Sequence, residues 1–404
     1  MGLRSAMLAA ILVALTVLLP IGVLLRLSIV RGSARRGLTE GRLLFGRLRL
    51  EARDRPKTVA GLGVRWLVLV LAQLLAIASM LVIANRQLVF YQEWSDLLGP
   101  RNAAIDLHPA GPALPGEPAP LSGSVAAPPQ EPLPPGKATP SGASLVTLQV
   151  TGQASGVRGD VLIWLPPAYV AQGNETKEFP VLFFLPGSPG TPEGVFNQFA
   201  FDAAASEAIG RGAVQPFIGV LPPIMTHPPR DTECLDIPNG PKSETWLTAD
   251  VRDAILRTVR ASRDPARWTA AGYSTGGLCA TNLLLRHRDK FGAAVSIGGY
   301  FRPWAKGDDL FGGSEDFRRS VSPVWQFQNT PPQPTRLLIV SSTRDRSSWS
   351  GPGVFDGDSA AMIEAAARWP GTAKIVLDTG GHDFVTYRPT LPLALEWLGR
   401  GNGL

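Results

Sequence analysis

Histidine and cysteine are scarce in this chain. Its 404 residues include only four histidines and two cysteines, Cys234 and Cys279. Neither cysteine has a ligand-like spacing to a histidine, so the sequence predicts no metal site, and no cofactor is implied. Internal repeats are absent as well, so nothing indicates a repeat architecture. At this length the chain could hold two or three units of ordinary domain size.

Excess positive charge is missing from most of the chain, although the whole carries a net charge of +6. Residues 1–66 hold twelve Lys or Arg and three Asp or Glu, a net charge of +9. The remaining residues hold 27 basic and 30 acidic side chains, a net charge of −3. The basicity therefore belongs to one short segment, and no basic patch with interleaved aromatic residues occurs elsewhere. The sequence predicts no nucleic-acid partner.

Two stretches lack charged residues altogether. They run from Met7 to Leu25 and from Trp66 to Ala84, nineteen residues each, and a helix of that length crosses about 30 Å of hydrocarbon. Neither stretch has a polar face, which argues against a soluble amphipathic pair. The first has no small-x-small cleavage site, which argues against a signal peptide. We therefore predict two transmembrane helices, 7–25 and 66–84, within a membrane anchor over residues 1–90.

Basic residues fill the segment between the two apolar stretches. Such a cluster in a short loop stays in the cytoplasm, so everything after residue 90 would lie outside a cell membrane that the chain crosses twice. In an oxidising exterior Cys234 and Cys279 could form a disulfide, and two buried free thiols are the alternative. These basic residues include Arg31, Arg35, Arg36, Arg42, Arg47, Arg49, Arg53, Arg55, Lys57 and Arg65.

Twelve prolines lie between Pro100 and Pro140, with Ala, Gly and Ser filling most of the gaps. This composition favours an extended, partly polyproline-II segment over a packed core. We predict an extracytoplasmic linker over residues 91–142 and a folded catalytic domain over residues 143–404.

Strand-like and helix-like segments alternate from about residue 145. Repeated strand–helix units indicate the α/β class, with a mostly parallel central sheet and helices on both faces. The predicted strands are 145–150, 161–165, 181–185, 217–221, 268–273, 293–297, 337–341 and 374–377, and the predicted helices are 247–260, 276–287, 359–369 and 391–398.

Ser274 stands at the centre of the pentapeptide Gly272-Tyr273-Ser274-Thr275-Gly276, after an apolar strand and before a helix. This is the G-x-S-x-G nucleophile elbow, in which a sharp turn strains the serine backbone and requires small residues two positions away on either side. The pattern predicts that the Ser274 hydroxyl is a nucleophile. Alone it is a weak signal, since Gly-Ser-Gly turns are common.

A serine nucleophile needs a base, and the base needs a group that orients it. His382 lies in a loop after the last predicted strand, at the sheet edge where the elbow should be, and we predict that it is the base. His108 lies in the Pro-rich segment, and His227 lies in a Pro-rich loop. His287 ends a helix among charged residues, where a solvated surface role is expected.

Asp345 follows the strand 337–341 and completes the order Ser, Asp, His. We predict that it orients His382. Asp356 and Asp358 are competitors in the same loop, and an ordinary turn residue paired with Arg344 or Arg346 is the alternative interpretation of Asp345.

Two backbone N–H groups should bind the oxyanion of the tetrahedral intermediate. One is expected from Thr275, directly after the nucleophile. The other is expected from the turn Leu185-Pro186-Gly187-Ser188-Pro189-Gly190. Because proline has no N–H, Gly187 or Ser188 must supply it, and we favour Ser188.

Together these motifs resemble the esterase D and antigen 85 type of α/β-hydrolase, which includes mycolyltransferases. The resemblance covers about residues 145–398. The segment GDVLIWLPPAYV is similar to an early strand of that family, and Glu244-Thr245-Trp246-Leu247-Thr248 is similar to the start of its helix before the nucleophile strand. Gly272 to Gly276 matches the nucleophile motif, and Gly381-His382-Asp383-Phe384 matches the histidine loop. The resemblance implies the α/β-hydrolase fold and ester chemistry.

The chain departs from the antigen 85 pattern at two places. That family carries Glu as the acid, where this chain offers Asp345. Its oxyanion turn has an Asp and an Arg that help to hold trehalose, and Pro186 and Pro189 occupy that neighbourhood here. The resemblance therefore does not carry trehalose or mycolate over as a substrate.

Aromatic residues are frequent between residues 300 and 327, where this fold often inserts a cap. The segment could form an acyl-chain groove or simply cover the core, and we favour the covering role. Asp231, Glu233 and Cys234 could rim the site. The aromatic residues are Tyr300, Phe301, Trp304, Phe311, Phe317, Trp325 and Phe327.

These observations favour a membrane-anchored extracytoplasmic serine esterase that acts on an acyl ester, which could be an envelope lipid or glycolipid. An acyltransferase that moves the acyl chain to an envelope sugar or lipid would use the same residues. A non-catalytic envelope-binding module is the third possibility.

Overall fold

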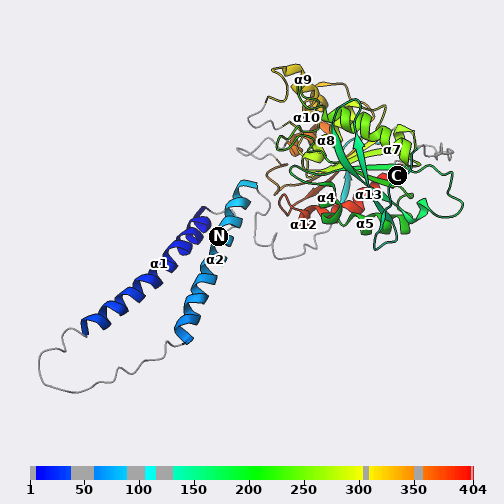
Figure 1. Ribbon diagram of the computed structural model, residues 1–404. Coiled ribbons are helices and arrows are strands. Elements are labelled where there is room, and N and C mark those ends of the chain that lie inside the picture. The colour runs from blue at the N-terminus through cyan, green and yellow to red at the C-terminus, as the bar shows by residue number, and fades with distance from the viewer. Residues whose placement is uncertain are drawn as a thin grey trace, which may run out of the picture. The chain divides into compact units, whose positions relative to one another are not determined.

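The chain divides into two compact units, Met1–Leu98 and Gly99–Leu404. The computed structural model (Figure 1) describes residues 6–37, 59–88, 105–114, 131–303, 309–349, 358–401 and 404.

The first unit contains two helices, α1 (Ala6–Gly37) and α2 (Val59–Leu88). Thr16 of α1 and Ser79 of α2 approach each other, with 3.5 Å between their hydroxyl oxygens. Most large apolar side chains described on both helices are exposed. Among the described residues, Trp66–Ala84 is long and apolar enough to cross a membrane, and Met7–Gly22 is a shorter apolar helix. The two-span anchor stays a prediction.

The second unit is built on a ten-stranded sheet in the order β1-β10-β9-β8-β7-β5-β6-β4-β3-β2. The six strands from β10 to β6 in this order are parallel, and β1, β4, β3 and β2 are antiparallel to their neighbours. The strands are β1 (Leu107–Pro109), β2 (Lys137–Ala138), β3 (Ser144–Thr151), β4 (Arg158–Leu165), β5 (Val181–Leu185), β6 (Ile218–Leu221), β7 (Trp268–Tyr273), β8 (Ala293–Ile297), β9 (Arg336–Ser342) and β10 (Thr372–Leu377). The predicted mostly parallel sheet is confirmed.

The longer helices confirm the alternating pattern. The predicted helix 247–260 begins earlier, with α6 (Ser243–Thr245) and a π-helical stretch, Trp246–Val251, that continues into α7 (Arg252–Thr258). The others are α4 (Pro192–Gln198), α5 (Phe201–Gly210), α8 (Thr275–Arg286), α9 (Glu315–Ser320), α10 (Pro323–Asn329), α11 (Ser359–Ala366), α12 (Phe384–Tyr387) and α13 (Leu391–Gly399), with short 3₁₀ turns at Pro167–Tyr169, Pro265–Arg267 and Arg388–Thr390.

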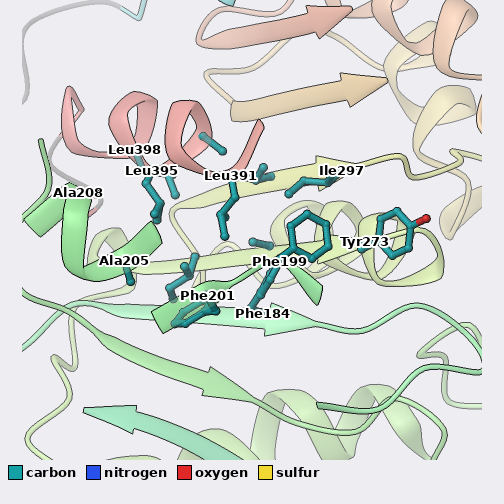
Figure 2. Packing of buried hydrophobic residues seen from close by; sticks show 14 of the residues in the cluster. Phe184, Phe199, Phe201, Ala205, Ala208, Tyr273, Ile297, Leu391, Leu395 and Leu398 are labelled. Carbon is teal, nitrogen blue, oxygen red and sulfur yellow. The ribbon is translucent and has the colours of Figure 1, made fainter. Parts of the chain in front are cut away.

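Apolar side chains on both faces of the sheet form the core. Successive residues of β5 alternate between the faces, so that Leu182 and Phe184 pack in one cluster and Val181, Phe183 and Leu185 in the other. Figure 2 shows the first cluster, where residues of α5 and α13 lie over the strands. Residues of α7 and α8 cover the second face. Each fully buried Phe contributes about 1.5–3 kcal/mol relative to exposure.

Parts of the predicted linker belong to this sheet. Strand β1 pairs with β10, and β2 pairs with β3. The carboxylate of Asp202 on α5 accepts hydrogen bonds from Thr139 Oγ1 at 2.7 Å and Ser141 Oγ at 2.6 Å. Prolines are tolerated here because an edge strand leaves some N–H groups without a ladder partner. These described parts of residues 91–142 therefore differ from an extended tether.

Candidate active site

Ser274 lies in a strained turn between β7 and α8. Its backbone angles are φ 58° and ψ −121°, a region that side chains rarely adopt. A Cβ on Gly272 would lie 2.2 Å from the carbonyl O of Gly276, and one on Gly276 would lie 2.4 Å from the carbonyl O of Leu185. Both positions therefore require glycine. The turn leaves the Ser274 side chain partly exposed while its neighbours are buried.

His382 reaches Ser274 from the loop after β10. Its Nε2 lies 2.8 Å from Ser274 Oγ, and its Nδ1 lies 2.8 Å from Asp345 Oδ2. The imidazole stacks on the Tyr273 ring with 5.0 Å between centroids. The Ser342 hydroxyl, at the end of β9, donates to the Gly380 carbonyl at 2.7 Å and so ties the aspartate loop to the histidine loop. Three predicted residues are thus brought together in a line of hydrogen bonds.

Asp345 is 0% exposed, yet its carboxylate has many donors. Burial alone would raise its pKa, but the charge of His382 and hydrogen bonds from His382, Ser347 and Tyr387 outweigh burial and lower the pKa to about 2. Burial and the charge of Asp345 raise the pKa of Tyr387 well above its usual value, so its hydroxyl stays a donor, 2.7 Å from Asp345 Oδ2. Asp345 is therefore ionised and can fix the orientation of the imidazole.

The competing side chains are placed elsewhere. Asp358 pairs with Arg302 at 2.9 Å, and Asp356 lies outside the described residues. His108 lies exposed in the edge strand β1, and His227 is exposed in its loop. The expectation for His287 was wrong: it is half-buried, and its Nε2 lies 2.7 Å from Glu244 Oε1.

The turn after β5 lies against Ser274 because β5 is the neighbour of β7 in the sheet. A Cβ on Gly187 would lie 3.1 Å from Ser274 Cβ. Within the described part of the chain, the N–H groups of Ser188 and Thr275 donate to no protein acceptor. The Ser188 hydroxyl is engaged with Met225 Sδ at 3.2 Å. Both N–H groups are available for an oxyanion.

Cys234 and Cys279 form a disulfide with 5.7 Å between their Cα atoms. Cys279 is on α8, five residues after Ser274, so the bond attaches the loop after β6 to this helix. Glu233, next to Cys234, has a partner that the sequence did not predict: the Tyr300 hydroxyl donates to its carboxylate at 2.8 Å. Burial, then the charges of Glu233 and Asp231, raise the pKa of Tyr300 well above its usual value.

The aromatic segment contributes mainly to packing where it is described. Phe301 and Phe327 are fully buried with Val324, Leu337 and Trp369 in a third core cluster. Phe311 packs on Phe317, and Trp325 is partly exposed. Trp304 lies outside the described residues. The covering role therefore accounts for the buried members of this segment.

Within the described residues there is no group of three or more His, Cys, Asp or Glu side chains that could hold a metal ion. The arrangement at Ser274 can instead perform nucleophilic acyl transfer: a hydroxyl, a base within bonding distance, an orienting anion and nearby N–H donors.

Comparison with known proteins finds similar sequences and similar solved structures. The chain matches an uncharacterized protein of Corynebacterium glutamicum at 25% identity over 258 residues, which span 61% of this chain and 58% of that protein. An S-formylglutathione hydrolase of Agrobacterium tumefaciens aligns with a TM-score of 0.54 at 16% identity, over 65% of this chain and 97% of the other. A feruloyl esterase module of Clostridium thermocellum aligns with a TM-score of 0.49 at 14% identity, over 70% and 98%. The sequence match to the Corynebacterium glutamicum protein therefore spans less than two thirds of that protein's length.

The family comparison covers most of the second unit. Residues 153–398 match the family described as "Putative esterase", a range that begins in the turn before β4 and ends in α13. It includes Ser274, Asp345 and His382. The chain belongs to this esterase family and has its α/β-hydrolase fold.

Proposed function

We propose that this protein is a membrane-anchored, extracytoplasmic serine esterase in which Ser274, His382 and Asp345 form the catalytic triad. His382 Nε2 takes the proton of the Ser274 hydroxyl as that oxygen attacks the ester carbonyl carbon. The N–H groups of Ser188 and Thr275 bind the resulting oxyanion. His382 returns the proton to the leaving alcohol, and water then resolves the acyl-enzyme by the same steps.

The observation that carries this proposal is the line Ser274–His382–Asp345, with 2.8 Å at each step. An ionised Asp345 at Nδ1 holds the proton there, which leaves the Nε2 lone pair for the serine. The same negative charge stabilises the imidazolium that forms during attack. Because α8 begins at Thr275, the N-terminal end of its dipole also favours the developing negative charge.

The proposed extracytoplasmic location depends on the first unit and on the disulfide. Two apolar stretches with a basic segment between them favour a hairpin whose connecting loop is cytoplasmic. The catalytic unit would then lie outside, where a disulfide such as Cys234–Cys279 persists. A protease-protection assay on intact cells tests this placement: added protease should cleave the second unit, and full protection of that unit would contradict the placement.

The substrate class is a carboxylic ester. The family and the fold shared with S-formylglutathione hydrolase favour acyl ester or thioester cleavage over other chemistry. An anchored domain meets lipids and glycolipids of the envelope, so we propose acyl esters of that kind. Transfer to an envelope sugar would use the same acyl-enzyme. Product analysis of the full chain, with and without an acceptor sugar, separates the two: free acid indicates hydrolysis, and an acylated sugar indicates transfer.

Ester hydrolysis by the full-length protein in membrane vesicles tests the proposal. Wild-type protein should hydrolyse p-nitrophenyl esters and react with a fluorophosphonate probe. Ser274→Ala should lose both, because the attacking oxygen is gone. Ser314→Ala, which removes an exposed serine hydroxyl at the start of α9, should retain both. Equal activity of Ser274→Ala and wild type would refute the proposed nucleophile.

A further inference from the structure

A second buried carboxylate is connected through Tyr300 to the residue after Ser274 and has no place in the proposed triad. Glu233 is 3% exposed, and its Oε1 accepts a hydrogen bond from the Tyr300 hydroxyl at 2.8 Å. The same hydroxyl lies 3.3 Å from Oγ1 of Thr275. Thr275 directly follows Ser274. A chain of polar contacts therefore leads from the loop after β6 to the residue whose N–H would bind the oxyanion.

The protons along this chain have one consistent direction. An ionised carboxylate only accepts, so Tyr300 gives its single proton to Glu233. The Thr275 hydroxyl can then donate its own proton to the Tyr300 oxygen. Hydrogen-bond donation therefore runs from Thr275 to Tyr300 and from Tyr300 to Glu233. The contact with Tyr300 thereby restricts the Thr275 side chain, and the Thr275 hydroxyl proton points toward Tyr300.

The loop that carries Glu233 is held in an unusual conformation. Glu233 and Cys234 have φ values of 49° and 61°, so two successive non-glycine residues are left-handed. The Cys234–Cys279 disulfide attaches this pair to α8, and the N–H of Glu233 donates to Asp231 Oδ1 at 2.8 Å. Strained backbone of this kind persists where surrounding bonds over-determine it, and it clusters at functional sites. Burying a carboxylate is also costly unless its partners are well placed.

We propose that Glu233 and Tyr300 are positioning residues that hold Thr275 so that its N–H is aimed at the oxyanion, with the disulfide fixing the loop that supplies Glu233. This inference rests on the proposed esterase function and adds two residues that do not touch the reacting atoms. Their effect should fall on transition-state binding, because the oxyanion exists only there. Binding of the ground-state ester should be nearly unchanged.

Tyr300→Phe in the full-length protein is the principal test, since it removes one oxygen atom and keeps the ring. Tyr169→Phe is the matched control: Tyr169 is also buried and its hydroxyl accepts from the Arg260 N–H at 3.2 Å, in the core cluster covered by α7. Glu233→Gln keeps an acceptor oxygen and removes the charge. For each variant, kcat and KM for a p-nitrophenyl ester are measured, and fluorophosphonate titration gives the concentration of active sites.

The inhibition constant of a trifluoromethyl ketone adds a readout specific to the oxyanion, because its adduct with the serine carries that charge. Tyr300→Phe should lower kcat about tenfold, less than the 10²–10³ expected for losing an oxyanion donor itself. KM should stay within about twofold, and the inhibition constant should rise by the same factor as kcat/KM falls. Glu233→Gln should lose less, and the double variant should be no worse than Tyr300→Phe, because both act through one path.

Three results would overturn the inference. They are an unchanged kcat per active site in Tyr300→Phe, a loss without weaker ketone binding, and a double variant whose loss is the product of the two single losses. If Tyr300→Phe does not fold, Glu233→Gln decides by the same ketone measurement. Wild-type protein without esterase activity would overturn the proposed function and this inference with it, whereas active wild type with an unaffected Tyr300→Phe overturns the inference alone.

Discussion

A histidine paired with a buried carboxylate lies near each end of helix α8, and we propose that only the pair next to Ser274 takes part in catalysis. At the first end His382 binds Asp345 at 2.8 Å through Nδ1. At the other end His287 binds Glu244 at 2.7 Å through Nε2. The distances are alike, and both carboxylates are buried. The difference lies in what else each pair contacts.

The partners of the two pairs decide their roles. In the first pair Nε2 is left for the Ser274 hydroxyl at 2.8 Å. In the second pair Glu244 also binds the Arg286 guanidinium through two hydrogen bonds, of 2.7 and 3.1 Å. Burial raises the pKa of Glu244, but hydrogen bonds from His287 and Arg286 outweigh burial and lower it. That carboxylate therefore fastens α6 to the end of α8, which is a structural task.

Removing each histidine should give the largest contrast. We expect His382→Ala to lower kcat by about 10⁴-fold or more, because the serine then has no base. His287→Ala should leave kcat within about twofold, since it touches no reacting atom. Steady-state hydrolysis of a p-nitrophenyl ester, normalised to protein that is folded by circular dichroism, measures both. A large loss of kcat in His287→Ala would contradict the assignment of a structural role to the His287–Glu244 pair.

Neutralising each carboxylate should give the next contrast. Asp345→Asn should lower kcat by about 10⁴-fold through the wrong imidazole tautomer while KM changes little. Glu244→Gln should keep kcat and instead reduce the free energy of unfolding by about 1.5–3 kcal/mol, the usual worth of a hydrogen bond to a charged group. Denaturant unfolding and enzyme kinetics on the same preparations separate the effects. Full activity in Asp345→Asn would show that another group orients His382.

Acid should lower the free energy of unfolding through both carboxylates, Asp345 and Glu244, and this effect should be smaller than the effects of the substitutions above. The pKa of Asp345 is lowered from 3.8 to about 2 in the folded protein, so its ionised form stabilises the fold above about pH 4. This stabilisation, on the order of 2 kcal/mol, is lost as pH falls toward 2. The pKa of Glu244 is also lowered, so its ionised form likewise stabilises the fold, and this stabilisation is also lost as the pH falls. Unfolding free energy measured from pH 5 to pH 2.5 should fall less steeply in Asp345→Asn than in wild type, and parallel curves would contradict this assignment.

The sequence predicted the active end of α8 better than the structural end. Ser274, Asp345 and His382 each follow a strand, and parallel strands place such residues at one edge of a sheet, so their meeting could be inferred from order alone. His287 and Glu244 lie 43 positions apart on helical elements, and no local pattern predicts which faces of two helices meet. The same limit hid the hydrogen bond between Tyr300 and Glu233 and the one between Tyr387 and Asp345, because the two partners of each bond lie far apart in the sequence.

The fold shows the same division between local and long-range information. Buried strands such as Val181–Leu185 and Trp268–Tyr273 agree with prediction residue for residue, because a continuous apolar run is visible in the sequence. Helices α4 and α5 were not predicted, since both are short and Ala200 between them has φ 49°, which breaks the helical period. Strand β1 was hidden in a Pro-rich stretch because its pairing depends on β10, more than 260 positions later.

Peptide mapping of a fluorophosphonate adduct tests the central claim most directly. The probe reacts only with a serine that a base has activated, so it reports the contact between Ser274 and His382 and not only the presence of the hydroxyl. We predict one phosphonyl group on the peptide that contains Ser274 in wild type and His287→Ala, and almost none in His382→Ala. An adduct at another serine, or equal labelling of Ser274 in His382→Ala, would contradict the account.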